Sequence, residues 1–192
     1  MPASEDRLAF RLDCGATWLN LLATVGTAFG PAPVERIATL DRYAEWLALN
    51  ELTPDQPAAE ADLRSARELR EVLRAVALAT VGEQQAPAAA VAELDRFLRT
   101  HDDPVRLTAE GRLRRAAPPT AAAALSRIAR QAVDQLTGPE RHTLKCCPEQ
   151  DCRGLFSDPS DRRRWCPSTA CASRGRVRAL RARRAAGATT VE

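Results

Sequence analysis

Four of the six cysteines form two pairs of equal spacing inside an arginine-rich C-terminal segment. Four residues separate Cys147 from Cys152 and also Cys166 from Cys171, and thirteen residues lie between the two pairs. Zinc binds four thiolates at the corners of a tetrahedron, and a closed four-ligand shell stabilises a fold without leaving a coordination position for catalysis. The spacing therefore predicts one structural Zn²⁺ held by these four cysteines.

Several alternatives remain open for this cysteine set. Cys146 could replace Cys147 with a five-residue gap, and His142 could displace a cysteine as a ligand. An iron–sulfur cluster also uses four cysteine thiolates, and four unrelated buried thiols would need no metal. Disulfides are less favoured than metal ligation in a reducing compartment. Cys14 and Cys146 are then spare thiols.

Charge is distributed unevenly along the chain. Residues 141–192 contain twelve Lys and Arg against five Asp and Glu, a balance of +7, so the total of +3 leaves −4 for residues 1–140. A basic segment beside an acidic body indicates an anionic partner. The arginines could instead lie on a solvated surface, or neutralise the acidic body and the thiolates.

DNA is the expected anionic partner, because the arginine fork pairs with phosphate oxygens and with the guanine edge. Arg178 and Arg181 could reach base edges if their helix entered a major groove. The candidate DNA contacts are Arg162, Arg163, Arg164, Arg174, Arg176, Arg178 and Arg181, with Arg183 and Arg184 further along the chain.

The fold is expected to be mostly α. Aromatic residues make up only 4% of the chain, so the core must consist mainly of Ala, Leu and Val, which favours packed helices. Apolar residues at three- and four-residue spacing behind Thr17, Thr39 and later start signals predict helices at 18–30, 40–50, 62–82, 87–99, 120–138 and 168–184. Alternation around Glu110-Gly111 predicts one small hairpin from 105–108 and 112–115, which needs a helical surface beneath it.

Gly138-Pro139 marks the expected domain boundary. Residues 1–140 would form a helical domain, and residues 141–192 a four-cysteine zinc module ending in a basic helix and a frayed tail at 185–192. A mini-core around the metal is expected from Leu155, Phe156, Trp165, Val177 and Leu180. Trp165 and Phe156 could instead stack on the bases of a single-stranded ligand.

The C-terminal module resembles the CGNR zinc-finger family. The resemblance lies in Arg163-Arg164-Trp165-Cys166, in Cys147 to Phe156 and in Cys171-Ala172-Ser173-Arg174, which stands where the family has Cys-Gly-Asn-Arg. Leu12-Asp13, residues 21–25 and residues 40–47 resemble the ABATE domain that precedes this finger in bacterial proteins. The resemblance implies a stress-induced transcription regulator that binds DNA through its finger.

The departure from Gly-Asn has a structural consequence. Ala172 and Ser173 replace the two residue types that best tolerate unusual backbone angles. This replacement predicts a more regular turn into the last helix, or the absence of a contact made by the Asn.

The expected protein is a cytoplasmic bacterial regulator with no membrane segment, since no apolar run approaches about 18 residues and the N-terminus lacks a secretory pattern. Its helical body would sense a small-molecule effector or form a homo-oligomer, although no ligand-binding residue can be assigned. The sequence contains no glycine-rich phosphate loop, Gly-x-Ser-x-Gly or His-Glu-x-x-His, so an enzyme is not expected.

Two other functions are compatible with the sequence. The zinc site could hold a protein-interaction scaffold whose arginines meet an acidic partner. Alternatively, an enzyme site could lie in the N-terminal body, where Asp13, Asn20 and Thr24 are close in sequence.

Overall fold

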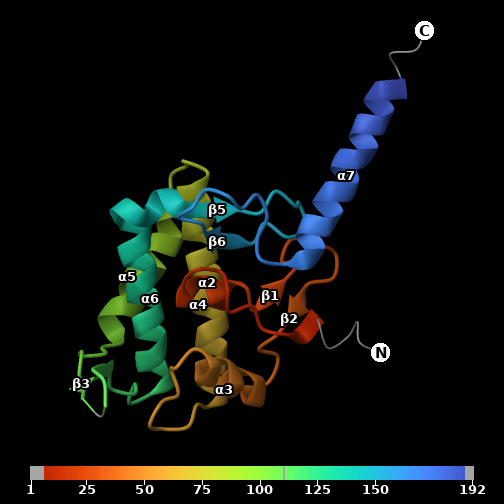
Figure 1. Cartoon of the computed structure of the whole chain (residues 1–192). Coiled ribbons are helices and arrows are strands. Elements are labelled where there is room, and N and C mark those ends of the chain that lie inside the picture. Colours follow the sequence, from red (N-terminus) through yellow and green to blue (C-terminus); the bar gives the residue numbers. More distant parts are fainter. Residues whose placement is uncertain (1–6, 110, 189–192) are drawn as a thin grey trace.

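The computed structural model describes residues 7–109 and 111–188, and shows a helical body from which the last helix projects (Figure 1). The helices are α2 (Thr17–Leu22), α3 (Leu40–Leu49), α4 (Glu60–Val81), α5 (Ala88–Thr100), α6 (Ala121–Thr137) and α7 (Thr169–Ala188), with a short 3-10 helix η1 (Pro139–Thr143). The fold is therefore mostly helical and ends in the four-cysteine module, as predicted.

The described residues also form three antiparallel two-stranded ribbons. They pair β1 (Val25–Gly26) with β2 (Val34–Glu35), β3 (Leu107–Thr108) with β4 (Arg114–Arg115), and β5 (Leu144–Cys146) with β6 (Leu155–Ser157). The middle ribbon is the predicted hairpin. The other two were not predicted, because two or three paired residues leave almost no alternation in the sequence.

Four of the predicted body helices are confirmed, and local capping explains where two of them begin. The Thr39 hydroxyl accepts a hydrogen bond from the Arg42 amide at 3.3 Å at the start of α3. Thr120 accepts from the Ala123 amide at 3.1 Å at the start of α6. These bonds satisfy amides that have no partner within the helix. At the other end of α4, Gly82 is the C-cap.

The predicted helix at 18–30 is wrong beyond Leu22. The Thr24 hydroxyl donates to the Leu21 carbonyl at 2.7 Å, and the Arg36 guanidinium donates to the Ala23 carbonyl at 2.9 Å. These side chains satisfy carbonyls that a longer helix would have used, and Val25 then enters β1. Thr17 is not the N-cap of α2, which is Ala16.

One hydrophobic core runs through the body and into the zinc module. Trp18, Tyr43 and Trp46 are fully buried within it, and α4 and α6 pack against each other at its centre. The same cluster includes Leu155 and Phe156 of β6. The β5–β6 ribbon thus shares the core of the body, and burial of a phenylalanine stabilises this attachment by about 1.5–3 kcal/mol.

The predicted separate mini-core around the metal is therefore wrong in part. Val177 and Leu180 are 48% and 50% exposed, because α7 extends past the body. Trp165 lies half-buried against the start of α7, where an added Cβ on Gly175 would be 2.4 Å from its Nε1.

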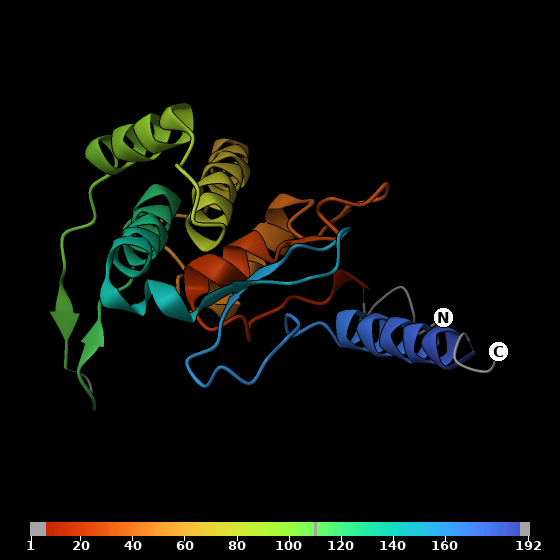
Figure 2. The same cartoon turned by 90° about the horizontal axis from the view of Figure 1, so that it is seen from above.

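The β3–β4 hairpin lies at the edge of the body beside α6 (Figure 2). All four strand residues are exposed, so the expected helical surface does not cover them. Ion pairs attach the hairpin instead: Asp103 accepts from Arg115 at 2.5 Å and from Arg127 of α6 at 2.8 Å. Of the predicted turn, Gly111 has φ +75°, which suits glycine, while Glu110 lies outside the described residues.

No helix among the described residues is both long enough and apolar enough to cross a membrane.

Candidate metal centre and basic helix

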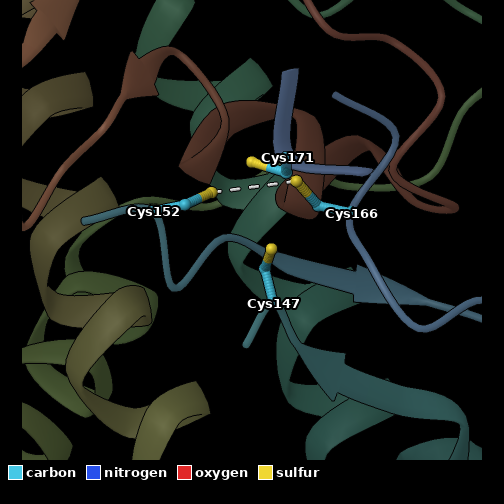
Figure 3. A group of neighbouring side chains, drawn as sticks. All are labelled: Cys147, Cys152, Cys166 and Cys171. Carbon is cyan, nitrogen blue, oxygen red and sulfur yellow. Dashed lines mark hydrogen bonds between the residues drawn. The ribbon is translucent and has the colours of Figure 1, made fainter. Parts of the chain in front are cut away.

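The four predicted cysteines converge on one point (Figure 3). All four sulfur atoms lie within 4.8 Å of one another, and Cys152 Sγ is 3.7 Å from Cys166 Sγ. A tetrahedral zinc with Zn–S bonds of about 2.3 Å places its sulfur ligands about 3.8 Å apart. The donor atoms, their number and their separation therefore fit one four-coordinate Zn²⁺.

The first pair of cysteines lies on the turn that joins β5 to β6. The Cys147 amide donates to the Gly154 carbonyl at 2.9 Å, and the Cys152 amide donates to the Glu149 carbonyl at 3.0 Å. A Cβ on Gly154 would lie 3.2 Å from Cys152 Sγ, closer than side chains ordinarily approach. The glycine therefore leaves room for the sulfur, and the turn aims both thiols at the same point.

The second pair comes from the loop before α7 and from α7 itself. Cys166 lies in the loop, and Cys171 lies in the first turn of the helix, where its amide donates to the Ser168 carbonyl at 3.1 Å. A metal bound to all four sulfurs consequently fixes the base of α7 to the β5–β6 turn.

The alternative ligands lie outside the cluster. The Cys146 thiol donates to the Cys147 carbonyl at 3.7 Å and to the Arg153 carbonyl at 3.5 Å, and burial raises its pKa. His142 Nδ1 lies 2.7 Å from the Pro139 carbonyl. Cys14 is buried, and burial raises the pKa of its thiol to about 12. Neither spare thiol has the lowered pKa of a reactive cysteine.

Hydrogen bonds among the four thiols lower the pKa of two of them. Hydrogen bonds from the Cys152 and Cys166 thiols lower the pKa of Cys147 to about 7. Those from Cys147, Cys152 and Cys166 lower the pKa of Cys171, with a further contribution from Arg174. The donors, Cys152 and Cys166, have raised pKa values for the same reason, and zinc binding displaces their protons.

Two acidic residues between Cys147 and Cys152 hold the basic helix. Glu149 is only 2% exposed, and its Oε2 lies 2.5 Å from Arg178 Nη2. Asp151 accepts from Arg174 Nη1 at 3.0 Å. We did not predict these contacts, although two acids inside an otherwise basic segment were a visible signal.

The structure separates the predicted DNA contacts into three groups. Arg174 and Arg178 form ion pairs with Asp151 and Glu149. These acids belong to the first knuckle, the turn between Cys147 and Cys152; the second knuckle is the segment between Cys166 and Cys171. Arg176 and Arg181 are exposed further around and along α7. The exposed loop arginines precede the helix and comprise Arg162, Arg163 and Arg164.

Within the loop, two of these arginines make local contacts. The Arg163 amide donates to Asp158 at 2.6 Å, and its guanidinium donates to the Asp13 carbonyl at 3.4 Å. The Arg164 guanidinium carbon lies 5.3 Å from the centre of the Trp165 ring. These contacts restrict the loop while its charged groups stay at the surface.

The turn that carries Ala172 and Ser173 is regular. Residues 171–174 all belong to α7, and none of them has a positive φ. The more regular entry into the last helix is thus present, and no residue at these two positions needs the backbone freedom of glycine or asparagine.

Comparison with protein families gives two adjacent matches. The ABATE family, described as "Putative stress-induced transcription regulator", matches residues 15–139. The CGNR zinc finger matches residues 143–184, the segment that holds the four clustered cysteines and thus one structural Zn²⁺ site. Neither is an enzyme family, and no curated protein matches the sequence significantly. Since the first match covers more than half of the chain, the protein belongs to the ABATE family and carries a C-terminal CGNR zinc finger.

Proposed function

We propose that this protein is a zinc-dependent, DNA-binding transcription regulator of the bacterial cytoplasm. Residues 141–192 form its DNA-binding module, and residues 1–140 form a domain that senses an effector or mediates self-association. The observation that carries the proposal is the arrangement of α7. The helix projects from the body (Figure 1), its base is tied to the zinc site, and Arg176, Arg181, Arg183 and Arg184 on it are exposed.

The exposed arginines on α7 are the proposed DNA contacts. A helix turns by about 100° per residue, so Arg176 and Arg183 share one face, opposite to the face of Arg174 and Arg178. On the face of Arg174 and Arg178, the carboxylates of Asp151 and Glu149 pair with the two arginines and neutralise their charge. The face of Arg176 and Arg183, together with the exposed Arg181 and Arg184, is available to phosphates or base edges.

The division between the two faces gives each arginine a separate role. Arg174 and Arg178 position the helix, whereas Arg176 and Arg183 contact the nucleic acid. The loop residues 162–164 add positive charge at the base of the helix, where they would contact phosphates and set the register without reading sequence.

The test is DNA affinity, measured by fluorescence anisotropy on a labelled duplex at several salt concentrations. Replacing Arg176 and Arg183 with Ala should weaken binding and reduce the slope of log affinity against log salt by about 0.9 per lost phosphate contact. The matched control replaces Arg96 and Arg99, two exposed arginines of α5, and loses the same charge. Equal weakening by both pairs would contradict a DNA-contacting face on α7.

Specificity is a separate measurement. Selection from a random duplex library should yield a sequence bound at least about a thousandfold more tightly than random DNA. Zinc dependence follows from the same assay, because Cys147→Ser removes a ligand and should abolish the selected binding while leaving the body folded.

A second candidate function is favoured by the exposed apolar residues of α7. Val177 and Leu180 are about half exposed between the arginines, a composition that also suits docking onto an acidic protein. In that case zinc holds a scaffold only, and all duplexes would bind equally and weakly. The random-library selection distinguishes the two functions.

A further inference from the structure

A cavity of about 310 Å³ lies between the helical body and the zinc finger. The body contributes β1, β2 and the segment before α2 to its wall. The finger contributes Cys152, Cys166, Ser168 and the first residues of α7, Thr169 to Cys171. Figure 1 shows β1 and β2 beside the base of α7, so one bound molecule would contact both parts of the protein.

Apart from the zinc-binding cysteines, the charged side chains that line this cavity are all positive. Five arginines line it, namely Arg7, Arg11, Arg36, Arg74 and Arg174, and no aspartate or glutamate lines it among the described residues. Part of this charge is already balanced: Arg74 pairs with Glu71 at 3.0 Å, and Arg174 pairs with Asp151 at 3.0 Å. Arg11 and Arg36 have no such pairing in the described chain.

Arg36 is the most constrained of these side chains. It is 7% exposed, and its Nη1 donates to the Ala23 carbonyl at 2.9 Å, yet its buried Nε has no partner among the described residues. Burial, and then the like charge of Arg11, lower the pKa of Arg36. The buried Nε of Arg11 also lacks a described partner. Buried donors without acceptors are destabilising, and an oxyanion in the cavity would satisfy them.

The zinc thiolates could be the counter-charge, since four thiolates and one Zn²⁺ carry a net charge of −2. However, the arginine that touches a thiolate is Arg174, whose Nη2 lies 3.5 Å from Cys171 Sγ. Arg11 and Arg36 make no hydrogen bond to a cysteine sulfur in the described structure. The guanidinium groups of Arg11 and Arg36 therefore remain available for a ligand that enters from solvent.

The apolar part of the wall includes Leu22, Val25, Val34 and Leu155. A volume near 300 Å³ is at the small end of ligand pockets, so the occupant must be a compact molecule. We propose that this cavity binds a small organic acid, with its carboxylate on Arg11 and Arg36 and its apolar part against Leu22, Val25 and Val34.

The position of the cavity makes this ligand an effector of the proposed regulator, and to that extent the inference rests on the proposed function. The first residues of α7 line the same cavity, and this end of the helix carries the positive end of its dipole. An acid bound there stabilises one orientation of α7 relative to the body. Ligand and DNA affinities are then coupled through that orientation.

The experiment measures ligand binding without DNA, by calorimetry and thermal shift of the full-length zinc-loaded protein. The probes are a series of monocarboxylates from propionate to benzoate, the neutral benzyl alcohol, and inorganic phosphate. Benzoate or another acid of the series should bind saturably and raise the melting temperature, while benzyl alcohol and phosphate should bind at least about tenfold more weakly. Equal binding of the neutral alcohol or of phosphate, or no saturable binding by any acid, would overturn the proposal.

Three variants assign the site. Arg36→Met and Arg11→Met should each weaken acid binding by about tenfold or more, as expected for loss of a charge-assisted contact. Gly26→Ala keeps both charges but displaces the Arg36 guanidinium, because the new Cβ would lie 2.7 Å from Nη2, and it should have the same effect. Arg96→Met, on the distant α5, should leave binding unchanged. If Arg36→Met loses zinc, Arg11→Met and Gly26→Ala carry the test, and unchanged binding in both overturns the assignment.

The outcome is independent of the DNA experiment. Acid binding that depends on Arg11 and Arg36, in a protein that binds no DNA, would support the pocket and reject the proposed function. Selective DNA binding with no acid binding would reject the pocket alone.

Discussion

Glu149, buried on the turn of the first zinc knuckle, places its Oε2 2.5 Å from the Nη2 of Arg178 on α7. The four-cysteine site already ties the first turn of the helix to this knuckle, and the ion pair adds a second attachment two turns further along. Two attachment points define the direction of a helix, whereas one would allow it to pivot.

Glu149→Gln should therefore loosen α7 without removing zinc. Loss of the charge-assisted bond should lower the free energy of unfolding by about 1 kcal/mol and speed hydrogen exchange of the helix amides after Gly175. Glu93→Gln removes an exposed ion pair on α5 and serves as the control, with an expected change under about 0.5 kcal/mol. Unchanged exchange in α7 would show that zinc alone orients the helix.

Gly175→Ala should destabilise the finger although alanine is the better helix former by about 1 kcal/mol. The new Cβ would lie 2.4–2.5 Å from three atoms of the Trp165 indole, a rigid group that cannot move aside without shifting the loop. Thermal unfolding should show the loss. In a Trp165→Leu background the same change should be neutral or stabilising, and persistence of the destabilisation there would reject the clash.

Replacing adjacent cysteines should have opposite effects on zinc content. Cys147 Sγ belongs to the cluster, whereas Cys146 Sγ lies against the Cys147 and Arg153 carbonyls. Cys146→Ser should retain one zinc per chain by elemental analysis, and Cys147→Ser should lose stoichiometric zinc. The reverse result would show that Cys146, and not Cys147, is the zinc ligand paired with Cys152.

Removal of zinc should unfold the knuckles and release α7 while leaving the body folded. Leu155 and Phe156 belong to the core of the body, so β6 is held by apolar burial as well as by the metal. After chelation, the near-ultraviolet circular dichroism of the buried Trp18, Tyr43 and Trp46 should persist. Loss of that signal together with zinc would show that the metal stabilises the whole chain.

The loop before the second knuckle should have a pH-dependent contribution to stability. Hydrogen bonds from the Ser160 hydroxyl and the Arg163 amide, with Lys145 nearby, hold the pKa of Asp158 well below its usual range. A depressed folded-state pKa stabilises the fold above the unfolded pKa of about 3.9, and this contribution is lost as pH falls below it. The difference in melting temperature between the native protein and Asp158→Asn should be largest near pH 7 and shrink toward pH 3. A constant difference would exclude the carboxylate as its source.

Helices were predictable from the sequence where the apolar pattern of the helix was long enough. Helices α3 to α6 were predictable because each repeats an apolar spacing over about three turns or more and has a local start or stop, such as Thr39, Gly82 or Thr120. The helix predicted through Phe29 failed because Arg36, thirteen residues beyond Ala23, supplies the hydrogen bond that ends it. Side-chain contacts between distant residues leave no periodic trace.

The sequence by itself determined the helical body and the four cysteines that converge, since helix periodicity and knuckle spacing are local properties of the chain. Only the tertiary structure decided that β6 joins the core of the body, that Arg174 and Arg178 face Glu149 and Asp151, and that Arg11 and Arg36 meet in one cavity. Those relationships arise from packing and charge between segments far apart in the chain. Whether a given arginine positions a helix or is open to a ligand depends on which acid lies beside it after folding.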